Sequence, residues 1–148
     1  MPGQVPWLTT GPETCEVVEN VIGGQLVEYR AASKVGVAAA NSAVVAGWAT
    51  QDAAPSTASS TATDAWGNTV LTTSLPSQYL AVQKVGTVKV TAAATLTAGT
   101  VVKAAANGQV VAWVSGTDGA EKIVGRVVEA GGITNGAVGR IRLGLGMA

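Results

Sequence analysis

Residues 101–113 have the sequence VVKAAANGQVVAW, in which Asn107-Gly108 separates two short apolar runs. Asn and Gly adopt positive φ angles at little cost, so this pair favours the tight turn of a β-hairpin. Val is enriched in strands because its branched side chain packs well on a pleated surface. The stretch therefore predicts two antiparallel strands, at 101–104 and 110–113, joined by a turn at Asn107-Gly108.

The sequence on both sides of this hairpin continues the strand pattern. Apolar and polar residues alternate over 88–91 (VKVT) and over 140–143 (RIRL), as expected of strands with one buried face. Further turn signals stand at Asp118-Gly119 and Asn135-Gly136. Strands between turns about ten residues apart are typical of all-β proteins, so we predict a small β-barrel or β-sandwich.

The order of these elements occurs twice along the chain. The segment 24–28 (GQLVE) aligns with 99–103 (GTVVK), and at the same offset Val35 aligns with Val110. Further on, 45–48 (VAGW) aligns with 123–126 (IVGR) after a short insertion in the second copy. We therefore expect a single β domain over residues 14–148, built from two similar halves at 14–85 and 86–145.

The apolar content of the chain comes mainly from small side chains. Hydrophobic residues make up 47% of the 148 residues, yet aromatic residues only 4%, and there is no Phe. A core of Ala and Val is thin, which suits closely packed sheets. Cys15, the only cysteine, and Trp48 and Trp113, which lie in apolar runs, are predicted to pack in this core.

Two segments lack a strand pattern. Residues 1–13 contain three prolines, so we expect an extended N-terminal arm there. Residues 52–79 include a Ser/Thr/Ala-rich run and are expected to form one long loop inserted in the first half. A large aromatic side chain in such a segment is costly to leave in water and is a favoured interface anchor. The candidate interface residues in the arm and loop are Pro6, Trp7, Leu8 and Trp66.

The charged residues exclude several kinds of function. Nine Lys and Arg balance nine Asp and Glu, and there is no His. A neutral chain offers little attraction to nucleic acid or an anionic membrane, and it lacks the commonest general base and metal ligand. We therefore expect no enzyme activity, no cofactor, no metal, and neither a nucleic-acid nor a membrane partner. Arg140 and Arg142 share one face of the last predicted strand, where they either meet an acidic patch on a partner or form a solvated strand face.

The segments 96–103 (LTAGTVVK), 107–111 (NGQVV) and 123–130 (IVGRVVEA) resemble the capsid cement, or head decoration, proteins of tailed bacteriophages. The segments 24–30, 44–47 and 138–143 are similar to the same family. The resemblance implies a small β-barrel or β-tulip-like domain that binds the outer surface of an assembled capsid. There it would cement neighbouring subunits of the major capsid protein, typically as a homotrimer, without catalytic residues.

The same resemblance implies where the protein is made and where it acts. It would be synthesised in the cytoplasm of the host bacterium and then reside on the virion, at the outer capsid surface. The sequence agrees, because its N-terminus has no signal-peptide pattern and its single cysteine indicates a reducing compartment.

Two other functions fit parts of the sequence. A carbohydrate- or host-surface-binding β-module could stack Trp7 and Trp66 on sugars, although acidic and amide residues beside them are sparse. A lipoyl- or biotinyl-type carrier domain is also a duplicated β structure, but it needs a lysine in a tight hairpin flanked by Met, Asp or Ala. The lysines that lack this setting are Lys34, Lys84, Lys89, Lys103 and Lys122.

Overall fold

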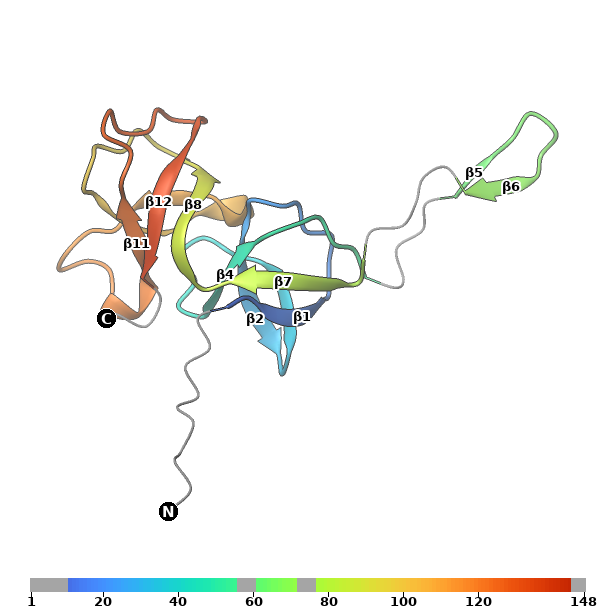
Figure 1. Ribbon diagram of the computed structural model, residues 1–148, viewed down its shortest axis with the longest axis horizontal. Helices are drawn as coiled ribbons and strands as arrows, with labels where there is room; N and C mark the ends of the chain where they lie inside the picture. Colours follow the sequence, from blue (N-terminus) through green and yellow to red (C-terminus); the bar gives the residue numbers. More distant parts are fainter. Residues whose placement is uncertain (1–10, 56–60, 72–76, 145–148) are drawn as a thin grey trace, which may run out of the picture.

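The computed structural model describes residues 11–55, 61–71 and 77–144. Within these residues the regular structure consists of β-strands and two short 3-10 helices, which confirms the prediction of an all-β fold. Figure 1 shows two bodies of strands side by side, with a small hairpin that stands apart from both.

The first body is a closed barrel of five strands in the order β1-β3-β2-β4-β7. The strands are β1 (Glu13–Val17), β2 (Leu26–Ala31), β3 (Lys34–Val37), β4 (Val45–Ala49) and β7 (Tyr79–Gln83). All neighbours are antiparallel except β1 and β3, which pair in parallel. Closure pairs every strand on both sides, so the barrel has no open sheet edge.

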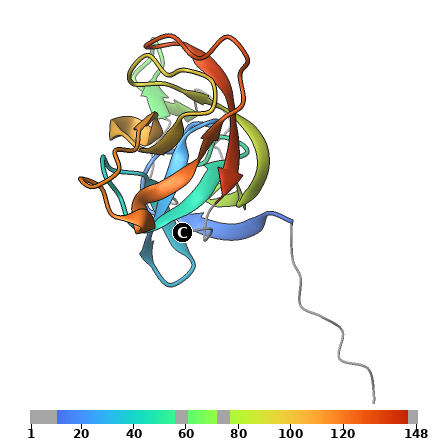
Figure 2. The ribbon, with the colours of Figure 1, turned by 90° about the vertical axis from the view of Figure 1, so that its left-hand side faces the viewer.

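The second body is a five-stranded antiparallel sheet in the order β10-β9-β11-β12-β8. Its strands are β8 (Val85–Thr91), β9 (Val101–Ala104), β10 (Val110–Ala112), β11 (Ile123–Val127) and β12 (Val138–Gly144), with 3-10 helices η1 (Ala106–Gly108) and η2 (Ala120–Lys122). In Figure 2 the later strands of this sheet, orange to red, lie in front of the first barrel. The predicted hairpin is confirmed, because β9 and β10 pair around Asn107 and Gly108, whose φ angles are 58° and 67°.

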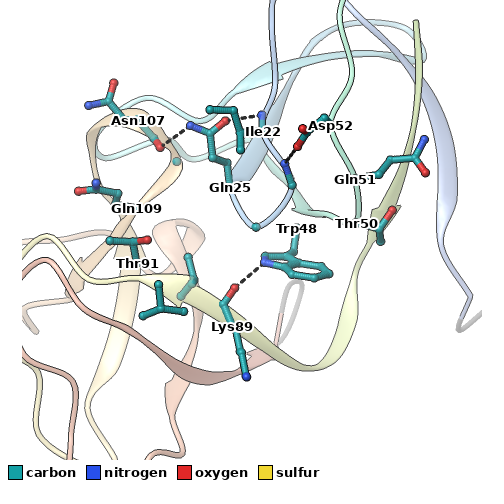
Figure 3. A pocket seen from close by; sticks show the side chains of 15 residues that line it. Ile22, Gln25, Trp48, Thr50, Gln51, Asp52, Lys89, Thr91, Asn107 and Gln109 are labelled. Carbon is teal, nitrogen blue, oxygen red and sulfur yellow. Dashed lines mark hydrogen bonds between the residues drawn. The ribbon is translucent and has the colours of Figure 1, made fainter. Parts of the chain in front are cut away.

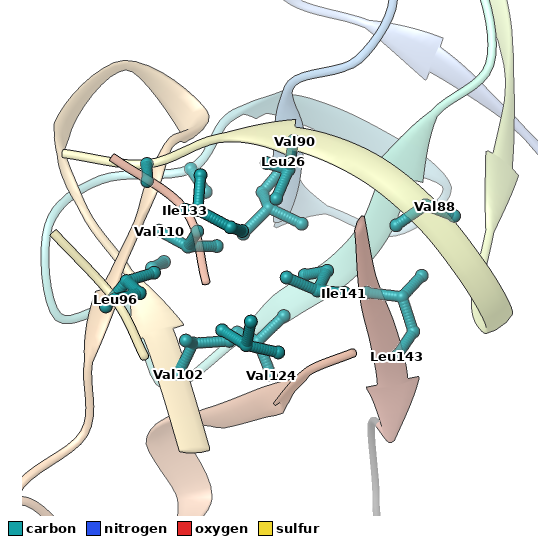
Figure 4. Close-up of a cluster of buried hydrophobic side chains, with 14 residues drawn as sticks. Leu26, Val88, Val90, Leu96, Val102, Val110, Val124, Ile133, Ile141 and Leu143 are labelled. Carbon is teal, nitrogen blue, oxygen red and sulfur yellow. The ribbon is translucent and has the colours of Figure 1, made fainter. Parts of the chain in front are cut away.

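The two bodies share one wall, formed by β2 and β4. Successive residues of a strand point to opposite faces. Val27 and Ala46 accordingly belong to the core of the first barrel, whereas Leu26, Val45 and Trp48 pack against the core of the second sheet. Figure 4 shows Leu26 beside Val90 in that second core. At these positions both faces of the wall are covered, whereas the end of β2 from Tyr29 is exposed, so the halves pack together over the first part of the wall.

The cores consist of small and branched apolar residues, as predicted, and Cys15 is buried among them. The prediction for Trp48 and Trp113 is only partly right, because both side chains are half-buried. An indole N–H needs an acceptor, and each finds one on the backbone near the surface. Trp48 Nε1 donates to Lys89 O at 2.8 Å, and Trp113 Nε1 donates to Gly119 O at 3.0 Å.

The expected long loop at 52–79 contains regular structure, so that part of the prediction is wrong. Strands β5 (Thr61–Thr63) and β6 (Thr69–Leu71) form an antiparallel hairpin within it. Ala53 also bridges to Val21 and to Ser77, which ties both ends of the insertion to the barrel. The expected arm at 1–13 overlaps β1 at Glu13, and its first ten residues lie outside the described part of the chain.

Candidate interaction surfaces

The tip of the β5–β6 hairpin is a hydrogen-bonded turn over residues 64–68. The Asp64 carboxylate accepts the backbone N–H groups of Trp66 and Asn68 at 2.9 and 2.8 Å. Gly67, at φ 82°, donates its N–H to Asp64 O at 3.1 Å. The backbone N–H of Asn68 is the main cause of a lowered pKa at Asp64, with Trp66 N–H adding to it, because donors stabilise the ionised carboxylate. The turn is thus held in one shape by its own residues.

This turn presents Trp66 to the solvent. The residue is 85% exposed, the highest value among the exposed large hydrophobic residues of the described chain. A large aromatic side chain gains free energy when it is removed from water, and the fixed turn reduces the entropy lost when it binds. The hairpin tip therefore has the properties of an anchor for a partner surface.

A second surface feature is a groove between the two bodies, with a volume of about 620 Å³. Trp48 lies at its centre, as Figure 3 shows, with Thr50, Gln51 and Asp52 on one side and Gln109 on the other. Its lining includes side chains from both halves. An indole ring surrounded by amides, hydroxyls and a carboxylate is a combination that can bind a polar ligand with one flat apolar face.

Hydrogen bonds hold part of this groove in place. Asp52 Oδ1 accepts the Gly23 N–H at 2.7 Å, and Gln25 Nε2 donates to Asn107 O at 3.1 Å across the two bodies. The second oxygen of Asp52 has no hydrogen bond to the described residues, so it can accept one from a ligand.

The predicted arginines lie on the outer face of β12. Arg140 and Arg142 are both exposed, but they differ in their contacts. Arg140 forms an ion pair with Glu129, with Nε 3.0 Å from Oε2. That hydrogen bond is the main cause of the lowered pKa of Glu129. Arg140 is therefore engaged within the chain, whereas Arg142 has no ion pair with another described residue.

The predicted interface residues do not converge on one site. Pro6, Trp7 and Leu8 lie outside the described residues. Trp66 is on the hairpin, and β12 lies at the opposite end of the molecule in Figure 1. Sequence reasoning missed the groove around Trp48, because its lining comes from segments that are far apart along the chain.

Metal-binding clusters and membrane-spanning helices were both sought in the part of the chain that the structure describes. Over 11–55, 61–71 and 77–144, no three His, Cys, Asp or Glu residues gather in a group that could hold a metal ion. In the same residues, no helix has the length and apolar character to cross a membrane.

Comparison with known proteins found a structural likeness but no sequence relative. No protein-family model and no curated protein matches the chain. The fold is similar to that of the head fiber gp8.5 N base of bacteriophage phi29, with a TM-score of 0.59 and 16% sequence identity. The match covers 90% of this chain and 92% of that chain. At this identity, the likeness shows a shared fold.

Proposed function

We propose that this chain is a structural protein of a bacteriophage head, which binds the outer capsid surface and cements neighbouring subunits of the major capsid protein. In this proposal it acts as a homotrimer, without catalysis or cofactor, and resides on the virion. The observation that carries the proposal is the fold shared with the phi29 head fiber base over nearly the full length of both chains. The resemblance of 96–103, 107–111 and 123–130 to phage cement proteins supports the same class.

The hairpin tip gives this proposal a physical contact point. Trp66 is 85% exposed, and the turn that carries it is held by hydrogen bonds between its own residues. Aromatic residues dominate the binding energy of many protein interfaces, and a capsid offers many equivalent sites. In a trimer, three such tips would bind at once, so modest individual contacts would add to a strong attachment.

Binding to phage heads tests the proposal directly. Purified protein would be incubated with heads that lack it and imaged by cryo-electron microscopy. We expect density at threefold or quasi-threefold positions of the capsid. Bare heads at saturating protein would contradict the proposal, and so would single monomers scattered without regard to symmetry.

The contribution of the hairpin is tested with a matched pair of variants. Trp66→Ala removes the exposed indole, and Tyr79→Ala removes another exposed aromatic side chain, 49% exposed on the first barrel. We expect Trp66→Ala to weaken head binding at least tenfold, as for an interface anchor worth about 2 kcal/mol, and Tyr79→Ala to change it less than twofold. Equal effects of the two substitutions would remove the hairpin from the proposed interface.

The groove around Trp48 favours a second candidate function, carbohydrate binding. The indole could stack on a sugar ring while Asp52 and Gln109 accept or donate hydrogen bonds at its hydroxyls. This site differs from the one expected at Trp7 and Trp66, because here amide and carboxylate groups do surround the tryptophan.

A glycan screen tests this second candidate. Trp48 packs against the core, so Asp52→Asn and Gln109→Ala are better probes than removal of the indole. We expect a bound glycan to lose at least fivefold in affinity with either variant, while Trp66→Ala leaves it unchanged. No glycan bound at millimolar concentration would exclude this function.

A further inference from the structure

A pair of arginines on the outer face of the second sheet stands without an acidic partner. Arg126 of β11 and Arg142 of β12 are direct neighbours across this antiparallel pair, and both are exposed. Neither forms an ion pair with any residue of 11–55, 61–71 or 77–144. Side chains at such positions have Cβ atoms about 4.5–5.5 Å apart, so two positive charges there repel each other. The pair therefore lowers the stability of the free protein.

Arg140 shows that the same strand face can supply a carboxylate to an arginine. Its Nε and Nη2 donate to the two carboxylate oxygens of Glu129, at 3.0 and 3.1 Å. Arg142 is only two positions further along β12 and points to the same face. An exposed arginine on this face can therefore form an ion pair within the chain, as Arg140 does. Arg126 and Arg142 lie on the same face, but neither has a carboxylate partner among the described residues.

These two arginines line a groove of about 810 Å³. In the sheet register, Val101 lies opposite Arg126 and Thr87 lies opposite Arg142, so a single row crosses the four strands β9, β11, β12 and β8. The groove also contains the apolar residues Val85 and Ile123. Its volume lies within the range of about 300–1,000 Å³ of ligand pockets, far more than one small anion needs. The shape and lining suit several residues of a peptide.

The distribution of charge along the chain favours an acidic ligand at this end. Residues 86–148 contain six Lys and Arg and three Asp and Glu, whereas residues 1–85 contain three Lys and Arg and six Asp and Glu. The net charge of zero is thus the sum of a basic second half, which contains the groove, and an acidic first half, which contains the hairpin. Such a field attracts carboxylates toward the groove before contact.

We propose that the Arg126–Arg142 groove binds an extended acidic segment of a partner protein, whose carboxylates pair with the two guanidinium groups while apolar side chains contact Val85, Val101 and Ile123. A guanidinium group binds a carboxylate through two parallel hydrogen bonds, which gives geometric specificity as well as attraction. Under the proposed function, on which the identity of the partner rests, the segment belongs to the capsid protein. The repulsion between the arginines is then relieved only in the complex.

The groove is tested first without phage heads, so that its failure can be told from failure of the proposed function. A capped hexapeptide of alternating glutamate and valine would be titrated into the isotopically labelled protein and followed by NMR. We expect shifts confined to residues of the groove, and at least a tenfold loss of affinity in the double variant Arg126→Gln/Arg142→Gln. The same peptide with glutamine in place of glutamate should bind at least tenfold more weakly.

Two control variants separate the groove from charge in general. Lys34→Gln/Lys89→Gln removes the same net charge at exposed residues outside the groove lining, and Arg140→Gln removes the neighbouring paired arginine. Both should bind the acidic peptide within twofold of wild type. The Arg126/Arg142 double variant should also keep or slightly raise the melting temperature, because it removes a repulsion; a purely structural role would lower it.

The same variants are then tested on heads. If wild type binds heads and the double variant loses at least tenfold while Arg140→Gln does not, the capsid segment is the ligand. Peptide binding without head binding would sustain the groove and overturn the proposed function. The groove proposal itself is overturned if the double variant binds the peptide like wild type. Binding of a DNA oligonucleotide or of phosphatidylglycerol vesicles with the same arginine dependence, but not of the peptide, would also overturn it.

Discussion

The first barrel and the second sheet contain the same turn before their second apolar strand. Before β2, the Gly24 N–H donates to Ala49 O, and before β9 the Gly99 N–H donates to Val127 O. Both glycines have positive φ angles, 96° and 81°. The isolated bridges Val21–Ala53 and Leu96–Ile133, and the bonds Gln25 N to Ile22 O and Thr100 N to Thr97 O, recur at the same positions. The two halves thus close this turn by the same backbone hydrogen bonds.

The halves differ in what they present to the solvent. In the first barrel the carboxylates of Glu13, Glu16 and Glu19 each lie in an ion pair with a nearby cation. The second sheet instead leaves Arg126 and Arg142 without an ion pair among the described residues. Only the first half inserts the β5–β6 hairpin between its strands. The shared turn therefore serves the fold, whereas the hairpin and the two arginines, which are candidate contacts, lie where the halves differ.

The largest expected loss of stability comes from substitutions in the wall that the two halves share. Leu26 is fully buried between the halves, and Leu80 is fully buried in the first barrel alone. Either leucine-to-alanine change should cost about 2–5 kcal/mol, because a buried cavity remains. Hydrogen exchange should show Leu26→Ala lowering protection in both halves. If Leu26→Ala lowered protection in the second sheet only, the two halves would be independently folding domains.

The next largest loss of stability is expected where η1 comes close to β2. Gly108 has φ 67°, and a Cβ atom there would lie 2.7 Å from Leu26 O. Gly116 has φ 81° with no atom within 4 Å, so it is a matched control for the backbone angle. Gly116→Ala should cost about 1 kcal/mol for the angle, and Gly108→Ala about 1–3 kcal/mol more for the displaced neighbour. Urea unfolding measures both; equal losses would show that the halves do not need this contact.

A smaller effect depends on pH. The hydrogen bond from Lys103 is the main cause of the lowered pKa of Asp118 in the second half. A carboxyl group whose pKa is lowered by folding stabilises the folded state at pH values above its ordinary pKa, which is 3.8 for Asp. That stabilisation is lost as the pH falls below 3.8 and passes through the lowered pKa. NMR titration should find the Asp118 pKa below 3.8, and Lys103→Met should return it toward 3.8. An unchanged pKa in the variant would contradict the assigned cause.

The smallest effect is expected at the hairpin. Trp66→Ala should change the free energy of unfolding by less than about 0.5 kcal/mol, because the indole is almost fully exposed. Asp64→Ala should instead loosen the turn, since it removes the acceptor of the Trp66 and Asn68 N–H groups. Thermal unfolding and amide exchange distinguish the two. A marked destabilisation by Trp66→Ala would mean that the indole packs on its own chain, unlike the second half's exposed arginines.

Local signals predicted the strands of the second half well. The hairpin at Asn107-Gly108 and the alternating stretch at 140–143 depend on neighbouring residues, which the sequence displays directly. The short strands within the insertion at 52–79 were harder to predict, because a Ser/Thr/Ala-rich composition is typical of loops. The flanking Thr residues and the Asp64 to Gly67 turn were the only available signal there.

Long-range features could not be predicted from the sequence. The parallel pairing of β1 with β3 joins strands separated by β2, so no local pattern specifies it. The shared face of Arg140 and Arg142 followed from the period of a strand. The ion pair of Arg140 with Glu129 did not, because Glu129 lies eleven residues away on the other side of a turn. Groove linings depend on such contacts, and they became visible only in three dimensions.

The wall formed by β2 and β4 also determines how the molecule would respond to force. A pull on the second sheet does not reach the first barrel through the short link at Lys84 alone. The load is also carried by the buried side chain of Leu26 and by two hydrogen bonds between the halves. These run from the Trp48 indole N–H to Lys89 O and from the Asn41 N–H to Ala104 O. Because these contacts act in parallel, the two halves would yield together when they are pulled apart, rather than one after the other.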